Sequence, residues 1–481
     1  MSDLLLGIDL GTTSVKAGVF VPDGTQLAGF AESYPTRRPA SGICEQNPAD
    51  WIRLIDSAMD QFRASGLINS VRCGALTSHV NTHVFVDQAG TPLRPAILWQ
   101  DTRATLEARE LNARMKDAEK IALLGAPIPI DASHLLARML WVKRHEPEIW
   151  DKTAHVLLPK DYALLHLTGE LATDALSNIG LVGQDGNYAS KILDLVPGAM
   201  ERMAQLRAMT SVVGNSRDGV PLANATMDGW VGLVGAGACR ENAFAYLSGT
   251  SEILGLSCRT VTQKPGIVVF AEAQGLRIHA GPTQSGGASQ QWFCDVAGLT
   301  IPEMAKMVQD KPLSRAPLFL PQLAGERAPI WNADLRGAFL GLEAGMQTAD
   351  FARAVYEGVA MSARHVLSAL EASGDVLASY LTCAGGGFKS DVWGQIRSDV
   401  LNRPLKRLAI TEAGVVGAAC IAAVASGMSE TLAQAHAPFS GIDKEWEPDP
   451  ACRAVYDDLF DIYLEALKTT EGLSKRLTAC R

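Results

Sequence analysis

Three short apolar runs open the chain, each closed by a cluster of turn residues. The runs cover residues 4–10, 15–20 and 26–30, with Gly-Thr-Thr-Ser at 11–14 and Pro-Asp-Gly at 22–24 between them. Such runs, separated by residues that favour turns, are typical of consecutive antiparallel strands. The pattern therefore predicts a β-meander at the start of the chain. An apolar triplet at 84–86, followed by a turn at 87–90, predicts another strand.

Helical periodicity appears later, in two segments. The first begins near Thr348, which we expect to be the N-cap, with Asp350 in the first turn. One face of this helix is formed by Phe351, Ala354, Val355, Val359 and Ser362. The second segment, residues 451–470, predicts a C-terminal helix. One side of that helix is formed by Val455, Leu459, Ile462 and Ala466.

The segment LGIDLGTTSVKAGVF near the start has a weak echo, AFAYLSGTSEILGLS, near the middle of the chain. Each consists of an apolar strand, a turn that contains Gly, Thr and Ser, and a second apolar strand. Two such hairpins predict a duplicated α/β architecture with a cleft between two similar domains. A chain of 481 residues suits two or three domains. We place the domains at residues 1–239 and 240–481, because the second hairpin begins just after Arg240.

Composition narrows the class of protein. Hydrophobic residues are 47% and charged residues 20% of the chain, which is typical of an ordinary globular protein. The net charge of −9 and the lack of a basic run argue against a nucleic-acid partner. The nine cysteines form no CxxC pair, which favours reduced thiols over a disulfide framework or a zinc site. We expect a cytoplasmic protein, because no signal peptide and no run of about 20 apolar residues is present.

The turn of the first hairpin has the composition of an anion site. Gly11 allows the backbone to approach a phosphate closely, and the next three residues offer hydroxyl and backbone N–H donors. Lys16 adds positive charge, and Asp9 at the strand end is a candidate ligand for Mg²⁺. An ordinary hairpin turn uses the same residue types for conformational reasons, so this turn alone does not decide between the two interpretations.

Two later segments repeat or extend this chemistry. The turn at residues 248–251 again contains Gly, Thr and Ser, and two such turns could bind a triphosphate from both sides. The glycine run at 384–390 follows an apolar strand. Its glycines provide either a flat surface for a planar ring or close packing of a helix on a strand. The run matches neither the dinucleotide-binding fingerprint nor the P-loop motif.

The dipeptide Asp228-Gly229 lies between the two candidate phosphate turns. On local grounds it predicts only a turn, as most Asp-Gly pairs do. Its position gives it a second interpretation, because a kinase needs a carboxylate within hydrogen-bond reach of the attacking hydroxyl. We therefore consider Asp228 a candidate general base.

Several long motifs together resemble the FGGY carbohydrate kinases. The first hairpin, GIDLGTTSVKAGVF, is similar to the family's first phosphate motif. PLRPAILWQDTRA and LLPKDYALLHLTGELATD resemble sugar-domain segments of the xylulokinases. FLPQLAGERAPIWNADLRGAFLGL resembles the C-terminal signature, and CAGGGFKSDVWGQIRSDVLNRPL the adenosine loop. The resemblance implies an actin-like ATPase fold of the ribonuclease H type, with two α/β domains around ATP and a sugar.

The resemblance also implies roles for individual residues. Asp228 falls at the catalytic base, and Asp9 at the aspartate associated with Mg²⁺. The phosphate loops correspond to Gly11, Thr12, Thr13, Ser14, Lys16, Gly249 and Thr250. Other nucleotide contacts correspond to Gly287, Gln291, Gly386 and Ser390. The sugar would be bordered by Trp99 and Asp101, and its binding segments include His79, Val80, Asn81 and Gly229.

The sugar segments depart from the xylulokinase pattern at three positions. Asn81 stands where those kinases have a sugar-contacting histidine, and Gly229 follows the catalytic aspartate where many have asparagine. Arg138 stands where a lysine is usual. The nucleotide segments are closer to the pattern, so these departures concern the identity of the sugar more than the reaction.

The function that this resemblance implies is transfer of the γ-phosphoryl group of ATP to a terminal hydroxyl of a small sugar. The first substrate candidate is the pentulose D-xylulose, and ribulose, a tetrulose or a tetritol are alternatives. A non-catalytic sugar or nucleotide sensor and an actin-like ATPase scaffold are alternatives from other classes. Mg²⁺ is the expected metal, no membrane partner is expected, and a homodimer is common in the family.

Overall fold

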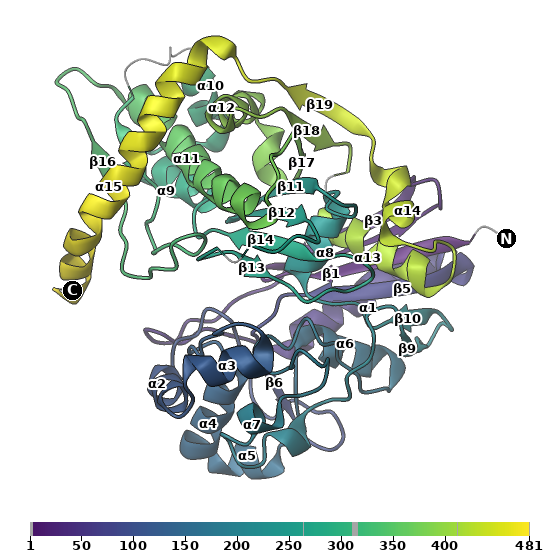
Figure 1. Ribbon diagram of the computed structural model, residues 1–481. Helices are drawn as coiled ribbons and strands as arrows, with labels where there is room; N and C mark the ends of the chain where they lie inside the picture. The colour runs from purple at the N-terminus through teal and green to yellow at the C-terminus, as the bar shows by residue number, and fades with distance from the viewer. Residues whose placement is uncertain (1–2, 263, 310–315, 411, 481) are drawn as a thin grey trace. The chain divides into compact units, whose positions relative to one another are not determined.

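The computed structural model describes residues 3–262, 264–309, 316–410 and 412–480. The chain forms two compact units (Figure 1). The first contains Met1–Gly235 and Gly414–Pro438, and the second contains Ala236–Ala413 and Phe439–Arg481. The first passage between the units lies close to the boundary we placed at residues 239 and 240. The boundary did not predict that Gly414–Pro438 returns to the first unit, because this segment packs against residues far away in the sequence.

A six-stranded sheet forms the centre of the first unit, in the order β3-β2-β1-β5-β10-β9. Its strands are β1 (Leu4–Leu10), β2 (Ser14–Phe20), β3 (Gln26–Ser33), β5 (Val71–Ser78), β9 (Val212–Asn215) and β10 (Pro221–Ala223). β1, β2 and β3 pair antiparallel, which confirms the predicted meander. β5 is parallel to both β1 and β10, and β9 is antiparallel to β10.

A seven-stranded sheet forms the centre of the second unit, in the order β13-β14-β12-β11-β17-β18-β19. Its strands are β11 (Ala243–Ser248), β12 (Glu252–Ser257), β13 (Val268–Val269), β14 (Ile278–Pro282), β17 (Leu381–Ala384), β18 (Leu405–Leu408) and β19 (Ile442–Trp446). β14, β12 and β11 are antiparallel, β11, β17 and β18 are parallel, and β19 is antiparallel to β18.

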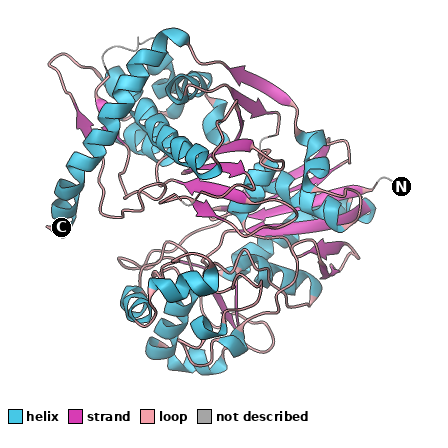
Figure 2. Cartoon of the chain, in the orientation of Figure 1, coloured by secondary structure: helices cyan, strands magenta, loops and turns pink. Residues whose placement is uncertain are grey.

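The two sheets share one arrangement of strands. In each, an antiparallel meander is followed by two parallel strands and an antiparallel edge strand. Parallel neighbours require crossover connections, and helices supply them in both units (Figure 2). The duplicated α/β architecture predicted from the two hairpins is therefore confirmed.

Described residues of the first unit form at least two hydrophobic cores. One lies against the sheet and includes Trp51 and Phe62 of α1 (Pro48–Ala64). The other fills a mainly helical region and includes Met139 and Trp150. The remaining helices of the unit are α2 (Thr105–Ala113), α3 (Asp117–Leu124), α4 (Leu135–His145), α5 (Pro147–Lys152), α6 (Pro159–Thr168), α7 (Ser190–Leu193), α8 (Asp228–Gly235), α13 (Ala413–Ala425) and α14 (Leu432–His436). The short strand predicted at 84–86 is β6 (Val84–Val86), paired with β8 (His155–Leu157), while β4 (Glu45–Gln46) pairs with β7 (Ala96–Ile97).

The core of the second unit surrounds the long helix α11 (Thr348–Gly374). Thr348 is its first residue and Gln347 its N-cap, which corrects our expectation by one position. The backbone N–H of Gln347 donates to Asp350 Oδ2 at 2.7 Å, so Asp350 fixes the cap one residue earlier. The other elements of the unit are α9 (Gly287–Ala297), α10 (Ile301–Gln309), α12 (Asp391–Leu401), β15 (Leu318–Leu320) and β16 (Ala338–Leu340).

The C-terminal helix α15 (Arg453–Ala479) is longer than the segment 451–470 that periodicity predicts. Its buried side is formed by Tyr456, Phe460, Tyr463 and Leu467. Two members of the predicted side, Val455 and Ile462, are instead 42% and 52% exposed. No helix among the described residues is long and apolar enough to cross a membrane.

Candidate active site

Three segments of the first unit meet at the carboxyl ends of its parallel strands. Asp9 stands near the end of β1, in register with Thr77 of β5. Ser78, the last residue of β5, forms a parallel bridge with Met227. Asp228 follows Met227 and begins α8. In α/β sheets this edge is where ligands bind, so the topology brings both candidate carboxylates to a suitable place.

Tyr34 lies close to both carboxylates. Its hydroxyl donates to the carbonyl oxygen of Gly11, and its backbone N–H donates to Thr13 O at 3.1 Å. Burial raises the pKa of Tyr34, and the negative charges of Asp9 and Asp228 raise that pKa further. The phenol therefore remains protonated and holds the first turn beside the two acids.

Asp9 has a basic residue across the hairpin and a close backbone neighbour. It pairs in register with Lys16 of β2, and side chains at such cross-strand positions lie near each other. A Cβ atom at Gly414 would lie 2.3 Å from Asp9 Oδ2. Glycine is therefore required at the point where the returning segment passes this carboxylate.

Contacts from Trp99 and from Gln46 hold the first turn. Trp99 Nε1 donates to Thr12 Oγ1 at 3.1 Å, and Gln46 Nε2 donates to Thr12 O at 2.8 Å. Asp101 is buried, and its oxygens accept from Cys44 N at 2.6 Å and from Arg103 Nη2 at 2.7 Å. Asp101 thus braces the loop that carries Trp99, while Trp99 itself contacts the predicted phosphate turn.

Asp228 begins a helix, which corrects the turn that its dipeptide predicts locally. The backbone N–H of Gly229 donates to Asp228 Oδ1 at 2.7 Å. A carboxylate at a helix N-terminus is stabilised in its ionised form by the helix dipole. A Cβ at Gly229 would meet no heavy atom of the described chain within 4 Å, so open space adjoins the acid.

His79 is fixed between β1 and β5 and is buried. The ring Nδ1 lies 3.0 Å from Leu10 O, and the backbone N–H of His79 donates to the same carbonyl at 3.1 Å. Burial lowers the pKa of His79 to about 4, so the ring is neutral at pH 7. Nε2 is buried with no hydrogen-bond partner among the described residues. Val80 is half-buried, and Asn81 adopts a left-handed backbone with φ of 54°, a conformation that Asn tolerates.

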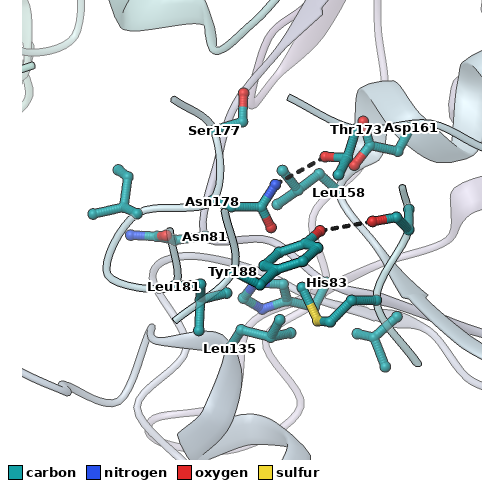
Figure 3. A pocket seen from close by; sticks show the side chains of 14 residues that line it. Asn81, His83, Leu135, Leu158, Asp161, Thr173, Ser177, Asn178, Leu181 and Tyr188 are labelled. Atoms are coloured by element: carbon teal, nitrogen blue, oxygen red, sulfur yellow. Dashed lines mark hydrogen bonds between the residues drawn. The ribbon is translucent and has the colours of Figure 1, made fainter. Parts of the chain in front are cut away.

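Asn81 also lines a small, partly open cavity of about 10 Å³ (Figure 3). Tyr188 OH donates to Ala204 O at 2.8 Å, and Asn178 Nδ2 donates to Thr173 Oγ1 at 2.9 Å on its wall. A cavity of this size holds about one water molecule. A sugar therefore does not fit in the described cavity, which Asn81 helps to line.

In the second unit, the turn between β11 and β12 is held by the N-terminus of α9. Gly287 N–H donates to Gly249 O at 2.9 Å, and Ala288 N–H donates to Thr250 O at 2.9 Å. Gly249 and Thr250 are exposed. Three of the predicted nucleotide residues are thus brought together, while Gln291 lies one turn along α9 and donates to Asp295 Oδ1 at 2.8 Å.

The glycine run packs against the end of β11. A Cβ at Gly385 would lie 2.4 Å from Ser248 O, and one at Gly387 would lie 2.0 Å from Ser248 Oγ. Gly386, by contrast, would meet no described heavy atom within 4 Å. Two glycines of the run therefore permit close packing against β11, and Gly386 adjoins open space. Ser390 follows as the N-cap of α12.

A buried ion pair connects these elements. Arg397 is fully buried and forms an ion pair with Glu252, the first residue of β12. It also donates to Gly387 O and to Ser248 Oγ, both at 2.8 Å. One guanidinium therefore joins the second hairpin to the glycine run.

Two family models match the chain in succession. The N-terminal domain of the FGGY family of carbohydrate kinases matches residues 4–238, and its C-terminal domain matches residues 221–426. The chain belongs to the FGGY family. It is a carbohydrate kinase with the actin-like ATPase fold, as the motifs implied.

The relatives of this FGGY kinase include xylulose kinases matched over their full length. The chain is 29% identical to "Xylulose kinase" of Staphylococcus epidermidis, with 99% of each chain covered. It is 29% identical to "Xylulose kinase" of Escherichia coli, with 94% of this chain and 96% of the relative covered. It is also 26% identical to "Gluconokinase" of Bacillus subtilis, with 90% and 89% covered.

Solved structures of FGGY kinases have the same fold. A xyloylose kinase from Brucella ovis is 26% identical, with a TM-score of 0.88 over 98% of this chain and 100% of that one. A gluconate kinase from Lactobacillus acidophilus is 22% identical, also with a TM-score of 0.88, over 99% and 100%. The likeness to the second structure concerns the fold alone.

Arg138 is a residue of this kinase whose contacts the sequence analysis missed. It is fully buried, and it donates to the carbonyl oxygens of Asn81 and Leu98 and, at 2.9 Å, to that of Ile97. Burial lowers the pKa of Arg138 to about 9, so the side chain remains charged at pH 7. Its position in the apolar segment LLARMLWV was an available signal, because a charge on a buried helix face needs partners.

Proposed function

We propose that this kinase transfers the γ-phosphoryl group of ATP to a terminal hydroxyl of a pentulose, with D-xylulose as the first candidate. The observation that carries the proposal is the meeting of Asp228 and Asp9 at the carboxyl edge of one sheet. The full-length relatives named as xylulose kinases support the choice of sugar.

Asp228 is the proposed general base. Its carboxylate would accept the proton of the attacking hydroxyl, and such a group contributes about 10²–10⁴-fold to a rate. The carboxylate stands at the start of α8, and the open space beside Gly229 leaves room for the acceptor. Asp228 is half-buried, so its charge is only partly screened by water.

The first turn would bind the phosphates, with hydroxyl and backbone donors from Thr12, Thr13 and Ser14 and charge from Lys16. Mg²⁺ would be held by Asp9 and would neutralise charge on the transferred group. The described residues contain no group of three or more His, Cys, Asp or Glu able to form a metal cage. This fits Mg²⁺, which usually keeps waters and takes its other ligands from substrate phosphates.

ATP is the proposed donor, and the second unit would bind its remaining parts. Gly249 and Thr250 would contact phosphate, beside Gly287 and Gln291 of α9. The open surface at Gly386, followed by the capping Ser390, would accept the adenosine. The hydrogen bonds from α9 to the second turn support this assignment, since they hold that turn in place without using its exposed hydroxyl.

The second candidate function is phosphorylation of another ketose or of an alditol. Asn81 favours it, because this residue replaces a histidine of the xylulokinases and offers both a donor and an acceptor on a shorter side chain. Its Nδ2 lies 3.4 Å from Ser133 Oγ, and its carbonyl accepts from Arg138. A site that binds one hydroxyl pattern discriminates against others, because its own polar groups are then left unpaired.

The deciding experiment measures ADP release with a panel of tetroses, pentuloses, hexuloses and alditols. We expect turnover of D-xylulose and of at least one other sugar with a comparable kcat/KM. A panel without turnover above background would contradict the kinase assignment.

A matched variant tests the role of Asn81 in this panel. Asn81→His should shift the preference toward D-xylulose while changing the KM for ATP little, because the residue lies in the sugar segments. Histidine also tolerates the left-handed backbone at this position. A wild-type preference for D-xylulose of about a hundredfold or more, unchanged in the variant, would show that Asn81 does not set specificity.

A further inference from the structure

A cluster of buried polar side chains lies behind the loop that leads to Asp228. Lys160, the second residue of α6, is buried in the first unit. Its Nζ lies 2.6 Å from Asp161 Oδ1 and 3.0 Å from Asp174 Oδ2, and both carboxylates are buried as well. Buried charges persist where they are paired and hydrogen-bonded, so this cluster is a fixed part of the unit.

Thr226 connects this cluster to the loop. The side chain is fully buried, and its Oγ1 donates to Asp174 Oδ1 at 2.6 Å. Ser177 Oγ lies 3.2 Å from the same hydroxyl. The carbonyl oxygen of Thr226 accepts from Thr77 Oγ1 at 2.6 Å. The cluster therefore holds the side chain of Thr226, while β5 holds its backbone.

The two residues before Thr226 are fixed by tertiary contacts too. Asn224 Oδ1 accepts from Lys160 Nζ at 3.4 Å, and its Nδ2 donates to Thr173 O at 2.8 Å and to Arg207 O at 3.0 Å. Ala225 is fully buried and adopts a left-handed backbone with φ of 53°. Alanine seldom adopts this conformation, and it persists only where the surrounding structure imposes it. The path of the loop is therefore not a local preference of its sequence.

The loop passes directly from Thr226 to the candidate base. Met227 bridges Ser78 at the end of β5, and Ser78 Oγ accepts from the backbone N–H of Lys160 at 3.0 Å. Asp228 comes next and begins α8. Only two residues separate the buried hydroxyl from the carboxylate, so a shift of Thr226 moves Asp228 as well.

We propose that Thr226, held by Asp174 and Lys160, is a positioning residue for the carboxylate of Asp228. Because Thr226 is fully buried, it acts through Asp228 rather than on the substrate. The inference rests on the proposed role of Asp228 as general base, and adds that turnover depends on groups buried behind the carboxylate. A catalytic group misplaced by about 1 Å can cost about 100-fold in rate.

Steady-state kinetics of two variants, with ATP and the panel sugar of highest kcat/KM, test this role. Thr226→Val keeps the shape of the side chain and removes the hydroxyl. We expect its kcat to be at least about tenfold lower, with the KM for ATP near the wild-type value. Thr226→Ser keeps the hydroxyl and should retain most of the wild-type kcat. A wild-type kcat in Thr226→Val, or equal losses in the two variants, would overturn the proposal.

Thr153→Val is the matched control for a general loss of structure. Thr153 is also buried in the first unit, and its Oγ1 donates to Ile149 O at 2.7 Å. Both valine variants therefore lose one short buried hydrogen bond, and we expect similar decreases of their melting temperatures. Only Thr226→Val should lower kcat. Similar losses of kcat in the two would show that the effect is not one of positioning.

The two carboxylates beside Lys160 supply a second comparison. Each forms an ion pair with Lys160, but Asp174 is the one that accepts from Thr226. Asp174→Asn removes a negative charge and brings an amide group into the cluster, and Asp161→Asn makes the same change at the other ion pair. We expect the larger loss of kcat in Asp174→Asn. Equal losses would overturn the role of Asp174 in holding Thr226.

A double-mutant cycle separates this inference from the function on which it rests. In the Asp228→Ala background, Thr226→Val should change kcat little, because the group that it positions is no longer there. Equal fold losses in the two backgrounds would overturn the positioning role and leave Asp228 as the base. A wild-type kcat in Asp228→Ala alone would overturn both the general base and the inference drawn from it.

Discussion

At the scale of residues, two carboxylates at one sheet edge have different surroundings. Asp228 begins a helix beside open space, whereas Asp9 lies opposite Lys16 and against the backbone of Gly414. The first arrangement suits proton transfer with an acceptor that enters and leaves. The second suits a fixed charge beside a phosphate turn.

We expect Asp228→Ala to lower kcat by about 10²–10⁴-fold, the usual contribution of a positioned general base. ATP binding should change little, because the base contacts the acceptor. Steady-state kinetics and a nucleotide-binding titration check both statements. A variant that keeps more than about a tenth of wild-type turnover would contradict the role of Asp228.

Asp9→Asn should reduce activity in a way that excess Mg²⁺ partly restores, because the change weakens a metal ligand and removes no proton acceptor. Activity is measured across a Mg²⁺ titration for this variant and for Asp228→Ala. Only the Asp9 variant should recover. Similar titration curves for the two would show that the division of roles is wrong.

Arg138 offers a third test at this scale. A lysine keeps the charge but lacks the planar fork that reaches the carbonyls of Asn81, Ile97 and Leu98. We therefore expect Arg138→Lys to raise the KM for the sugar while leaving the KM for ATP near its wild-type value. Arg138→Met should in addition destabilise the fold, since each buried unpaired carbonyl costs about 1–3 kcal/mol. Equal changes in both KM values for the lysine variant would argue for a general structural role.

At the scale of elements, the second hairpin depends on the packing of its neighbours. The end of β11 has no space for a side chain at Gly387, and the buried pair of Arg397 and Glu252 holds the hairpin and the glycine run together. Buried groups on the inner side of the hairpin therefore fix the geometry of the exposed turn at Gly249.

Gly387→Ala should lower stability by about 1–3 kcal/mol, the usual cost of extra volume in a packed site. Its Cβ would lie 2.0 Å from Ser248 Oγ. Gly386→Ala is the matched control, because its Cβ meets no described heavy atom within 4 Å. Thermal unfolding of the two variants makes the comparison. Equal melting temperatures would show that the contact with Ser248 relaxes without cost.

At the scale of the whole molecule, buried histidines connect stability to pH. Burial lowers the pKa of His79 and of His134 to about 4, against about 6.5 in an unfolded chain. Between these values the unfolded state binds protons that the native state does not. The contribution of these two neutral rings to the free energy of unfolding is therefore fully present near neutral pH. It decreases as the pH falls from about 6.5 toward 4.

His134 allows this dependence to be tested. Its Nδ1 accepts from Leu136 N at 3.2 Å at the start of α4, and asparagine can replace it as a cap without titrating. The stability lost between pH 7 and pH 5 should be about 2 kcal/mol smaller in His134→Asn, by urea unfolding at both values. The exposed His145 supplies the control variant His145→Gln. An unchanged pH dependence in His134→Asn would contradict a neutral buried ring.

Local patterns along the chain were sufficient to predict the meander, the two hairpins, the helix α11 and the family. Each depends on side chains a few positions apart, or on motifs read in one continuous stretch. For the same reason Asp228 could be selected from its place between two phosphate turns, although its dipeptide predicts a turn and the structure has a helix.

Only the tertiary structure decided which distant residues meet. Asp9 and Thr77 lie near the ends of β1 and β5, and Asp228 begins α8. The three lie together because β5 is parallel to β1 and Ser78 bridges Met227. The buried position of Arg138 follows from packing, which periodicity does not specify. The side of α15 predicted from its apolar residues is partly exposed, because the helix buries the adjacent face through Tyr456 and Tyr463. A sequence pattern records that a side chain is apolar, but burial depends on what the rest of the fold places against it.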